Sequence, residues 1–270
     1  IILLMNHAQH SFTYEAMTTL FEVIIEGGEY EYARQAAGAV FREVDRVNDL
    51  LNKYDPGSDI GQVNLLKPGE SIRVTLETIE CLEMATWVYT VSDGLFDPTL
   101  GTGFQGLEID RANFSVGWKK GGKGEVNLGG IGKGYAIDRA REILTDWEIE
   151  TAVINGGTST VLAWGKKWDI GVGGPWGEKV GLTQLQLENE ALSGSGTEVK
   201  GDHIINPKTG KAAQRHLAAW AVHPSAATSD ALSTAFMMME PTKIAALCRK
   251  NPEITAFVVT PDESFLKMGV

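Results

Sequence analysis

The sequence has few of the residues that mark several common classes of protein. Its 270 residues include two cysteines, Cys81 and Cys248, and no CxxC pair. A paired-cysteine metal site is therefore absent, and nothing indicates a disulfide. Both cysteines lie in apolar patterns typical of a helix, so we interpret them as core residues. The sequence also lacks an HExxH motif and a serine nucleophile elbow, and it therefore gives no sign of a zinc protease or a serine hydrolase.

Basic residues are also scarce, with 24 Lys and Arg against 35 Asp and Glu, for a formal net charge of −11. The densest basic run, Lys119–Lys123, is broken by two glycines, so no basic stripe suits a nucleic acid, and no nucleic-acid partner is expected. The chain begins with the apolar run Ile1–Met5, which is too short for a signal peptide or a membrane span. We expect no transmembrane span, and we interpret residues 1–10 as an N-terminal extension or a cloning remnant.

The pattern of apolar residues predicts a mixture of helices and strands. Hydrophobic residues make up 43% of the chain and charged residues 22%, which is typical of a globular protein. Periodicity and turn residues predict helices over Glu31–Leu51, Thr75–Val91, Tyr135–Leu144, Ser229–Met238 and Pro241–Arg249. They predict a long strand or hairpin over Ser11–Ile25, and strands at Glu125–Leu128, Thr151–Ile154, Ser159–Trp164, Trp168–Val172, Thr183–Leu187, Ala191–Ser195, Ala219–Val222, Ile254–Val259 and Ser264–Met268. We expect an α+β fold with mostly antiparallel sheets and two closely packed lobes.

A glycine-rich segment runs from Asn127 to Asp138 with the sequence NLGGIGKGYAID. Glycines between a strand and a helix let backbone amides approach a phosphate, and the N-terminus of the helix favours negative charge. The spacing matches neither a dinucleotide-binding fingerprint nor a P-loop. A tight structural turn that needs positive φ is the alternative interpretation.

A second segment, ATSDALSTA, covers residues 227–235. Asp230 and Thr234 are four residues apart, so both side chains project from one face of the predicted helix. A carboxylate, a hydroxyl and a nearby backbone carbonyl are hard oxygen donors of the kind that Mg²⁺ prefers. The alternative is that Ser229 or Thr228 caps the helix and Asp230 compensates the helix dipole in its first turn.

Further candidate residues lie in loops. His203 precedes Ile204 near the turn Asn206–Gly210, where a histidine can accept a proton at neutral pH or serve as a partly exposed strand residue. The segment GLFDPTLG at residues 94–101 offers an aromatic ring in Phe96 and a carboxylate in Asp97, which can instead form a local turn.

Taken together and in this order, these motifs resemble the FAD:protein FMN transferase (ApbE) family. The resemblance runs from Met17 to about Thr260 and also includes AMTT at residues 16–19, LNKY at 51–54 with Ser58, Asn155–Gly157, Ser193–Gly194 and HIINPKTG at 203–210. It implies a single FAD-binding transferase domain over residues 1–270. It also implies an enzyme, typically bacterial, that binds FAD and Mg²⁺, cleaves the pyrophosphate, attaches FMN to a Thr or Ser of an acceptor protein and releases AMP.

The resemblance assigns roles to particular residues. It implies that Asp230, Thr234 and the carbonyl of Gly130 hold the metal. It also implies two catalytic residues, Asp230 and His203, of which His203 is the base that deprotonates the acceptor hydroxyl. The residues that it places along the FAD site are Met17, Tyr54, Leu95, Phe96, Asp97, Asn127, Lys133 and Ile204. A metal on the phosphates would also explain how an acidic protein binds a polyanion.

The chain differs from the family pattern at a few positions. Asn127 and Asn206 stand where the family commonly has Asp, and the segment at 195–202 is short. Two alternatives to protein flavinylation therefore remain open. One is an FAD pyrophosphatase that gives free FMN and AMP, and the other is a flavin-binding protein with impaired catalysis. The resemblance implies a periplasmic location or an anchor on the outer face of the inner membrane, with a cytoplasmic location as the alternative.

Overall fold

The computed structural model describes residues 2–3, 9–175, 181–196 and 204–269. Its largest element is an eight-stranded sheet in which all neighbouring strands are antiparallel. The strands follow the order β14 (Phe265–Met268), β13 (Thr255–Val259), β12 (Ala218–His223), β11 (Glu190–Gly196), β8 (Thr160–Trp164), β7 (Ala152–Gly156), β3 (Thr19–Glu26) and β2 (Gln9–Ala16). A three-stranded sheet consists of β1 (Ile2–Leu3), β9 (Trp168–Gly173) and β10 (Gly181–Leu187).

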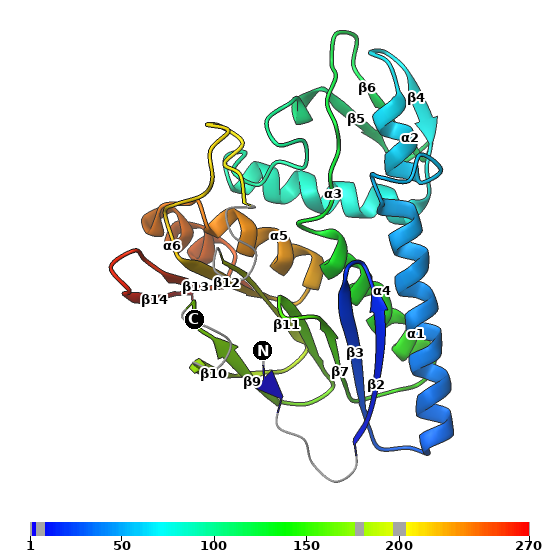
Figure 1. Cartoon of the computed structure of the whole chain (residues 1–270), viewed down its shortest axis with the longest axis vertical. Coiled ribbons are helices and arrows are strands. Elements are labelled where there is room, and N and C mark those ends of the chain that lie inside the picture. Colours follow the sequence, from blue (N-terminus) through cyan, green and yellow to red (C-terminus); the bar gives the residue numbers. More distant parts are fainter. Residues whose placement is uncertain (1, 4–8, 176–180, 197–203, 270) are drawn as a thin grey trace.

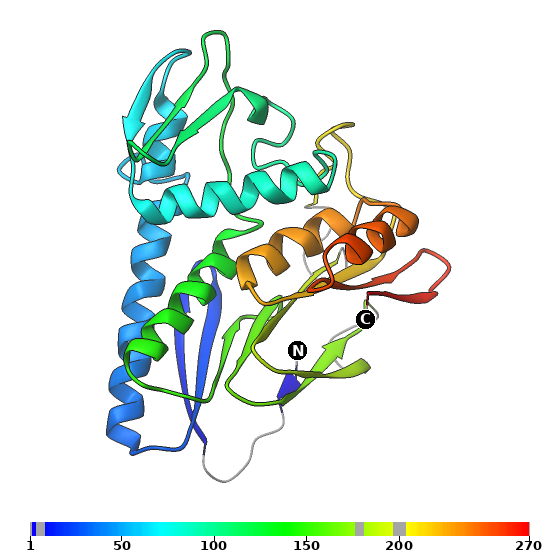
Figure 2. The ribbon, with the colours of Figure 1, turned by 180° about the vertical axis from the view of Figure 1, so that it is seen from behind.

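The helices and the second small sheet complete the described part of the chain. The helices are α1 (Tyr30–Leu51), α2 (Asp59–Leu65), α3 (Leu76–Val91), α4 (Gly132–Asp146), α5 (Ala226–Phe236) and α6 (Pro241–Lys250), with a 3-10 turn at Phe104–Gly106. The strands β4 (Ser71–Arg73), β6 (Ser115–Trp118) and β5 (Leu107–Asp110) form a small antiparallel sheet. Figure 1 shows this sheet with α2 and α3 at one end of the molecule, and Figure 2 shows the helices from behind. None of the described helices is long and apolar enough to cross a membrane.

Alternation of side chains along the central strands produces two hydrophobic cores. Leu162 of β8 belongs to the core under the helices, whereas its neighbours Val161 and Ala163 belong to the core on the opposite face. Residues of β9, such as Ile170, close that second core. Successive side chains of a strand point to opposite faces, so one sheet supports both layers. The arrangement is therefore three-layered, with helices, the large sheet and the sheet containing β9.

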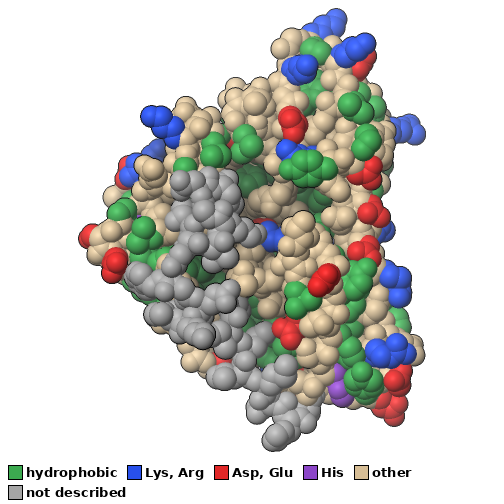
Figure 3. All heavy atoms as spheres, in the orientation of Figure 1, with side chains coloured by type: hydrophobic (Ala, Val, Ile, Leu, Met, Phe, Trp, Pro, Cys, Tyr) green, Lys and Arg blue, Asp and Glu red, His purple; other side chains and the backbone are tan. Residues whose placement is uncertain are grey.

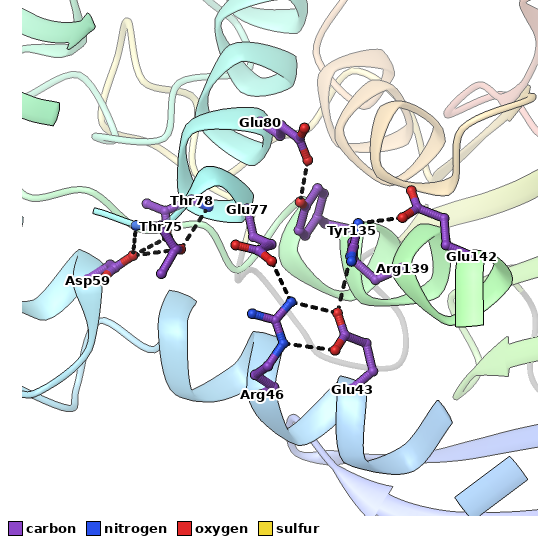
Figure 4. Close-up of polar contacts among 10 residues, drawn as sticks. All are labelled: Glu43, Arg46, Asp59, Thr75, Glu77, Thr78, Glu80, Tyr135, Arg139 and Glu142. Carbon is purple, nitrogen blue, oxygen red and sulfur yellow. Dashed lines mark hydrogen bonds and ion pairs between the residues drawn. The ribbon is translucent and has the colours of Figure 1, made fainter. Parts of the chain in front are cut away.

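A polar network joins the end of the molecule that carries α3 to the main body. Arg46 of α1 donates to Glu43 at 2.8 Å and to Glu77 of α3 at 2.6 Å, and Arg139 of α4 donates to Glu43 at 3.1 Å. Tyr135 of α4 donates its hydroxyl proton to Glu80 at 3.0 Å. Figure 4 shows these side chains converging where the three helices meet. The hydrogen bonds from Arg46, joined by those from Arg139, lower the pKa of Glu43, so this buried carboxylate stays charged.

The expected α+β fold with mostly antiparallel sheets is confirmed, and so is the interpretation of the two cysteines, which are free and buried. Helix α2 and the sheet β4-β6-β5 were not predicted. The predicted strand at Glu125–Leu128 is wrong, because those residues form no strand. The backbone of Val126 is instead paired with the side-chain amide of Asn64, which accepts at 2.7 Å and donates at 2.9 Å.

The predicted start of the helix that carries Asp230 is also wrong. Helix α5 begins at Ala226 and is capped by Ser225, whose hydroxyl accepts from the amide of Thr228 at 3.2 Å. Ser229 is buried inside the helix and donates its hydroxyl proton to the carbonyl of Ala221 at 2.7 Å. Asp230 therefore lies in the second turn rather than the first, and it does not act as a dipole-compensating residue at the helix end. Helix α4 begins at Gly132, three residues before its predicted start at Tyr135.

Candidate functional site

A cavity of about 540 Å³ lies where loops from the α3 end of the molecule meet the ends of β11 and β12 and the start of α4. Its volume is in the range of ordinary small-molecule sites. Figure 3 shows the hollow near the middle of the molecular face, with a basic side chain visible inside it. Its lining residues are Tyr54, Leu95, Phe96, Asp97, Pro98, Leu100, Asn127, Gly129, Gly130, Lys133, Thr158, Ser159, Gly173, Gly174, Pro175, Gly194, Ser195, Gly196, Ile204, Ile205, Pro207, Ala218, Trp220, Asp230, Thr234 and Met238.

Helix α5 supplies a carboxylate and a hydroxyl to the floor of the cavity. Asp230 and Thr234 lie one turn apart, and both line the cavity as their spacing predicted. Asp230 is 4% exposed, which makes it a buried carboxylate beside an open space. Ser195 of β11 places its hydroxyl 3.4 Å from that of Thr234 and 2.9 Å from that of Ser233. The floor is therefore rich in oxygen donors.

The N-terminus of α4 faces the same floor. The amide of Gly134 donates to a carboxylate oxygen of Asp230 at 3.2 Å, and the Lys133 ammonium lies 3.6 Å from the same oxygen. The N-cap residue, Ile131, supplies no side-chain cap, and the Asp230 carboxylate takes that place from α5. An ammonium group at a helix N-terminus favours an anion, so this part of the cavity suits a phosphate.

Close packing of α4 against α5 fixes the two halves of the floor relative to each other. A Cβ atom on Gly134 would lie 2.2 Å from the carbonyl oxygen of Ala226, so only glycine fits there. Asp138 of α4 accepts from the Ser225 hydroxyl at 2.7 Å and from the amides of Ala226 and Ala227 at 2.7 and 3.0 Å. Burial raises the pKa of Asp138, although these hydrogen bonds oppose that shift.

The opposite wall of the cavity is apolar and comes mainly from the loop after α3. Phe96 is buried, and a Cβ atom on Gly130 would lie 3.2 Å from its ring, so ring and glycine turn are in contact. Asp97 does form the local turn considered for it, because its carboxylate accepts from the amide and hydroxyl of Thr99, both at 2.7 Å. Tyr54 is 84% exposed at the rim.

The cavity brings together all the candidate residues except Met17 and His203. Met17 does not line the cavity. It lies at the β2–β3 turn with a φ of 48°, and its neighbour Thr18 has a φ of 60°. His203 lies outside the described residues, so its role stays a prediction. Asn127 and Asn206 each accept from the backbone amide two residues later, at 3.0 and 2.9 Å.

Several cavity residues were missed by the sequence analysis. Ser195 lies in a predicted strand, and the direction of its side chain depends on pairing with β8 and β12. Trp220 reaches the cavity because its indole lies over Gly194, where a Cβ atom would be 2.6 Å away. Such contacts between neighbouring strands leave no short motif in the sequence. Leu100 belongs to the same segment, 94–101, as Asp97, and its place in that segment was the available signal.

The donor set limits the kind of metal that the site could hold. Among the described residues, no group of three His, Cys, Asp or Glu side chains could hold a metal ion. The buried Asp230 carboxylate and the Thr234 hydroxyl one helical turn away are oxygen donors, and Gly130, whose carbonyl is the third candidate, lines the same cavity. Mg²⁺ commonly binds through one or two carboxylates, with waters and substrate phosphates completing its shell. The residues present therefore fit a Mg²⁺ ion held jointly with a phosphorylated ligand.

Comparison with protein families adds independent information. Residues 17–258 match the model of the ApbE family. The chain is 26% identical to the FAD:protein FMN transferase of Chlamydia pneumoniae, covering 84% of this chain and 83% of that protein. It is 24% identical to the enzyme of the same name from Klebsiella pneumoniae strain 342, covering 88% and 86%.

Solved structures show the same fold. The flavin transferase ApbE from Vibrio cholerae superimposes with a TM-score of 0.83 at 20% identity, covering 96% of each chain. The ApbE protein from Thermotoga maritima superimposes with a TM-score of 0.83 at 26% identity, covering 96% of this chain and 97% of the other. The similarity therefore spans the cavity and all three layers of the fold.

Proposed function

We propose that this chain, which belongs to the ApbE family, is a Mg²⁺-dependent FAD:protein FMN transferase. It cleaves the pyrophosphate of FAD, attaches FMN through a phosphoester to a Thr or Ser of an acceptor protein, and releases AMP. Relatives that match over more than four-fifths of the chain are named for FMN transfer from FAD to protein. The observation that carries the proposal is the meeting of Asp230, Thr234 and Lys133 at the N-terminus of α4 inside one cavity.

The cavity matches the two kinds of surface that FAD presents. The pyrophosphate is anionic and suits the floor, where the Lys133 ammonium and the positive end of the α4 dipole lie. The rings are flat and largely apolar and suit the wall that contains Leu95 and Phe96. The formal net charge of −11 would otherwise oppose binding of a polyanion, so local positive groups at the floor are essential.

The metal would be held by the Asp230 carboxylate, the Thr234 hydroxyl and the Gly130 carbonyl. When bound, Mg²⁺ neutralises charge on the phosphates and on the leaving group. Asp230 is buried and takes a hydrogen bond from the amide of Gly134, so its orientation is set before a ligand arrives. Such preorganisation is what catalysis of phosphoryl transfer mainly requires.

The transfer forms one bond and breaks one bond at phosphorus. The acceptor hydroxyl oxygen attacks the phosphorus of the FMN half, the bond from this phosphorus to the bridging oxygen breaks, and AMP leaves with that oxygen. The hydroxyl proton passes to a base, for which His203 is our candidate. Lys133 lies where it can offset negative charge on the phosphate oxygens during the step. No covalent enzyme intermediate is needed, because one displacement transfers the group.

An assay of AMP release tests the proposal through Asp230. We expect wild-type protein, FAD and Mg²⁺ to release AMP in step with covalent FMN on a Thr- or Ser-containing acceptor, and EDTA to stop both. Asp230→Asn keeps the shape of the side chain but removes its charge, so turnover should fall by at least about 100-fold. Asp146→Asn, at the exposed end of α4, is the matched control and should leave turnover unchanged.

The same assay separates the two alternatives. Equal release of AMP and free FMN without any acceptor would identify an FAD pyrophosphatase. Tight binding of FAD with no AMP release would identify a flavin-binding protein without catalysis. Full turnover of Asp230→Asn would contradict the metal assignment.

A further inference from the structure

Leu100 is an apolar residue held in an unfavourable backbone conformation at the edge of the cavity. Its φ is 50°, in the left-handed region, and the residue is 52% exposed. It lies in the loop between α3 and β5 (Figure 1) and lines the cavity together with Leu95 and Phe96. Leucine rarely adopts this conformation, because its Cβ crowds the backbone.

Neighbouring contacts hold Leu100 in this conformation. Its amide donates to the carbonyl of Asp97 at 2.9 Å, and the Asp97 carboxylate accepts from the amides of Thr99 and Gly101 at 2.7 and 3.1 Å. Gly101 packs so closely that a Cβ atom there would lie 2.3 Å from the carbonyl oxygen of Pro207. The loop backbone is thus tied at both ends, which fixes the position of the Leu100 Cα and the direction of its Cα–Cβ bond.

The residues around Leu100 indicate that its exposure has a functional reason. The preceding residues, Pro98 and Thr99, are buried, and only Leu100 of this trio is exposed. Strained backbone that persists beside a cavity is more often retained for function than elsewhere, because folding alone would favour a residue that tolerates positive φ. An apolar side chain beside Leu95 and Phe96 suits a flat aromatic ring better than a phosphate.

We propose that Leu100 determines binding affinity by packing against an aromatic ring system of bound FAD. The inference rests on the proposed function and deepens it, because it assigns a specific contact to a residue of segment 94–101 to which the resemblance gave no role. The bound ring covers the exposed half of the side chain, and the strained loop keeps that side chain in place before the ligand arrives. Both ring systems of FAD share the required chemistry, so the experiment must distinguish them.

Leu100→Asn is the test variant, since Asn tolerates left-handed φ better than leucine and presents a polar group of similar size. We expect its thermal midpoint to equal or exceed that of the wild type, while the Kd for FAD rises about fivefold or more through loss of apolar contact. Leu100→Met keeps an apolar side chain and should bind FAD within about twofold of the wild type. Binding is measured by titration calorimetry without an acceptor.

The chain provides a matched control in Phe114. Its φ is also 50°, it is 46% exposed, and its amide donates to the carbonyl three residues earlier, just as that of Leu100 does. It lies in the turn between β5 and β6 and does not line the cavity. Phe114→Asn should therefore leave the Kd for FAD unchanged. An equal loss of affinity in this variant would contradict the proposal, because the effect would then be general.

Separate titrations with FMN and ADP identify the ring. If Leu100→Asn loses more affinity for FMN than for ADP, the contact is with the flavin ring. If it loses more affinity for ADP, the contact is with adenine. An unchanged affinity for FAD, FMN and ADP overturns the proposal while leaving the proposed function intact. Failure of the wild type to bind FAD overturns both.

Discussion

Removal of the Lys133 ammonium should strengthen the binding of a metal ion in the absence of FAD and should weaken FAD binding. In the ligand-free protein, this ammonium lies 3.6 Å from a carboxylate oxygen of Asp230 and competes with any cation for that oxygen. Lys133→Met keeps the length of the side chain and removes the charge. The affinity for the metal ion should therefore rise while the affinity for FAD falls. A general loss of structure would lower both affinities.

The structure sets the size of the effect. At an effective dielectric constant of about 20, two unit charges 3.6 Å apart attract by 332/(20 × 3.6), or about 4.6 kcal/mol. Both side chains are mostly buried, with 17% and 6% of their surfaces exposed, so solvent screens the pair only in part. Desolvation and side-chain entropy offset most of the attraction, and we expect a net effect of about 1–2 kcal/mol. This corresponds to about a 5- to 30-fold gain in metal affinity.

Mn²⁺ titration followed by electron paramagnetic resonance, without FAD, measures this affinity directly. Lys53→Met is the control, since Lys53 is also 17% exposed and pairs with Glu125 at 2.7 Å, away from Asp230. We expect tighter Mn²⁺ binding only in Lys133→Met, together with a higher Kd for FAD. Unchanged or weaker Mn²⁺ binding in Lys133→Met would refute the reasoning.

Two further predictions concern the packing that supports the site. Gly134→Ala should lower the free energy of unfolding by about 2–3 kcal/mol, because the new methyl group meets the carbonyl of Ala226, whereas Gly132→Ala in the same helix meets nothing closer than 3.7 Å and should be tolerated. Chemical denaturation checks both. His223 accepts from the amide of Ser225 at 2.9 Å, and burial lowers the pKa of its ring. As the pH falls, the His223 ring is protonated in the unfolded chain at a higher pH than in the folded protein. The free energy of unfolding should therefore decrease as the pH drops below about 6.5, by at most about 1.4 kcal/mol per pH unit. His223→Gln should have a shallower dependence between pH 7 and 5, and an identical slope would contradict this assignment.

Some of the site could be predicted because it follows from spacing along one helix. Asp230 and Thr234 are four residues apart, and the helical period alone places both side chains on the face of α5 that lines the cavity. This prediction did not depend on the residue at which α5 begins. The start itself was mispredicted because Ser225, Thr228 and Ser229 can all cap a helix. Tertiary contacts decide among them, since Asp138 of α4 accepts from the Ser225 hydroxyl.

Other features depend on partners that are distant in the sequence. Val126 looked like a strand residue, but its backbone is paired with the side chain of Asn64, 62 residues away. Trp220 lines the cavity only because β11 presents a glycine beneath its indole. The pattern of apolar residues indicates which residues are buried and whether they follow a helix or strand period. It does not indicate which distant group forms a hydrogen bond with a given backbone amide.

The mass of an acceptor after incubation with purified protein, FAD and Mg²⁺ tests the central claim most directly. The account predicts a gain of one FMN moiety on a Thr or Ser side chain, with one AMP released for each FMN attached. Release of AMP and free FMN at the same rate whether or not an acceptor is present, with no gain in acceptor mass, would contradict it.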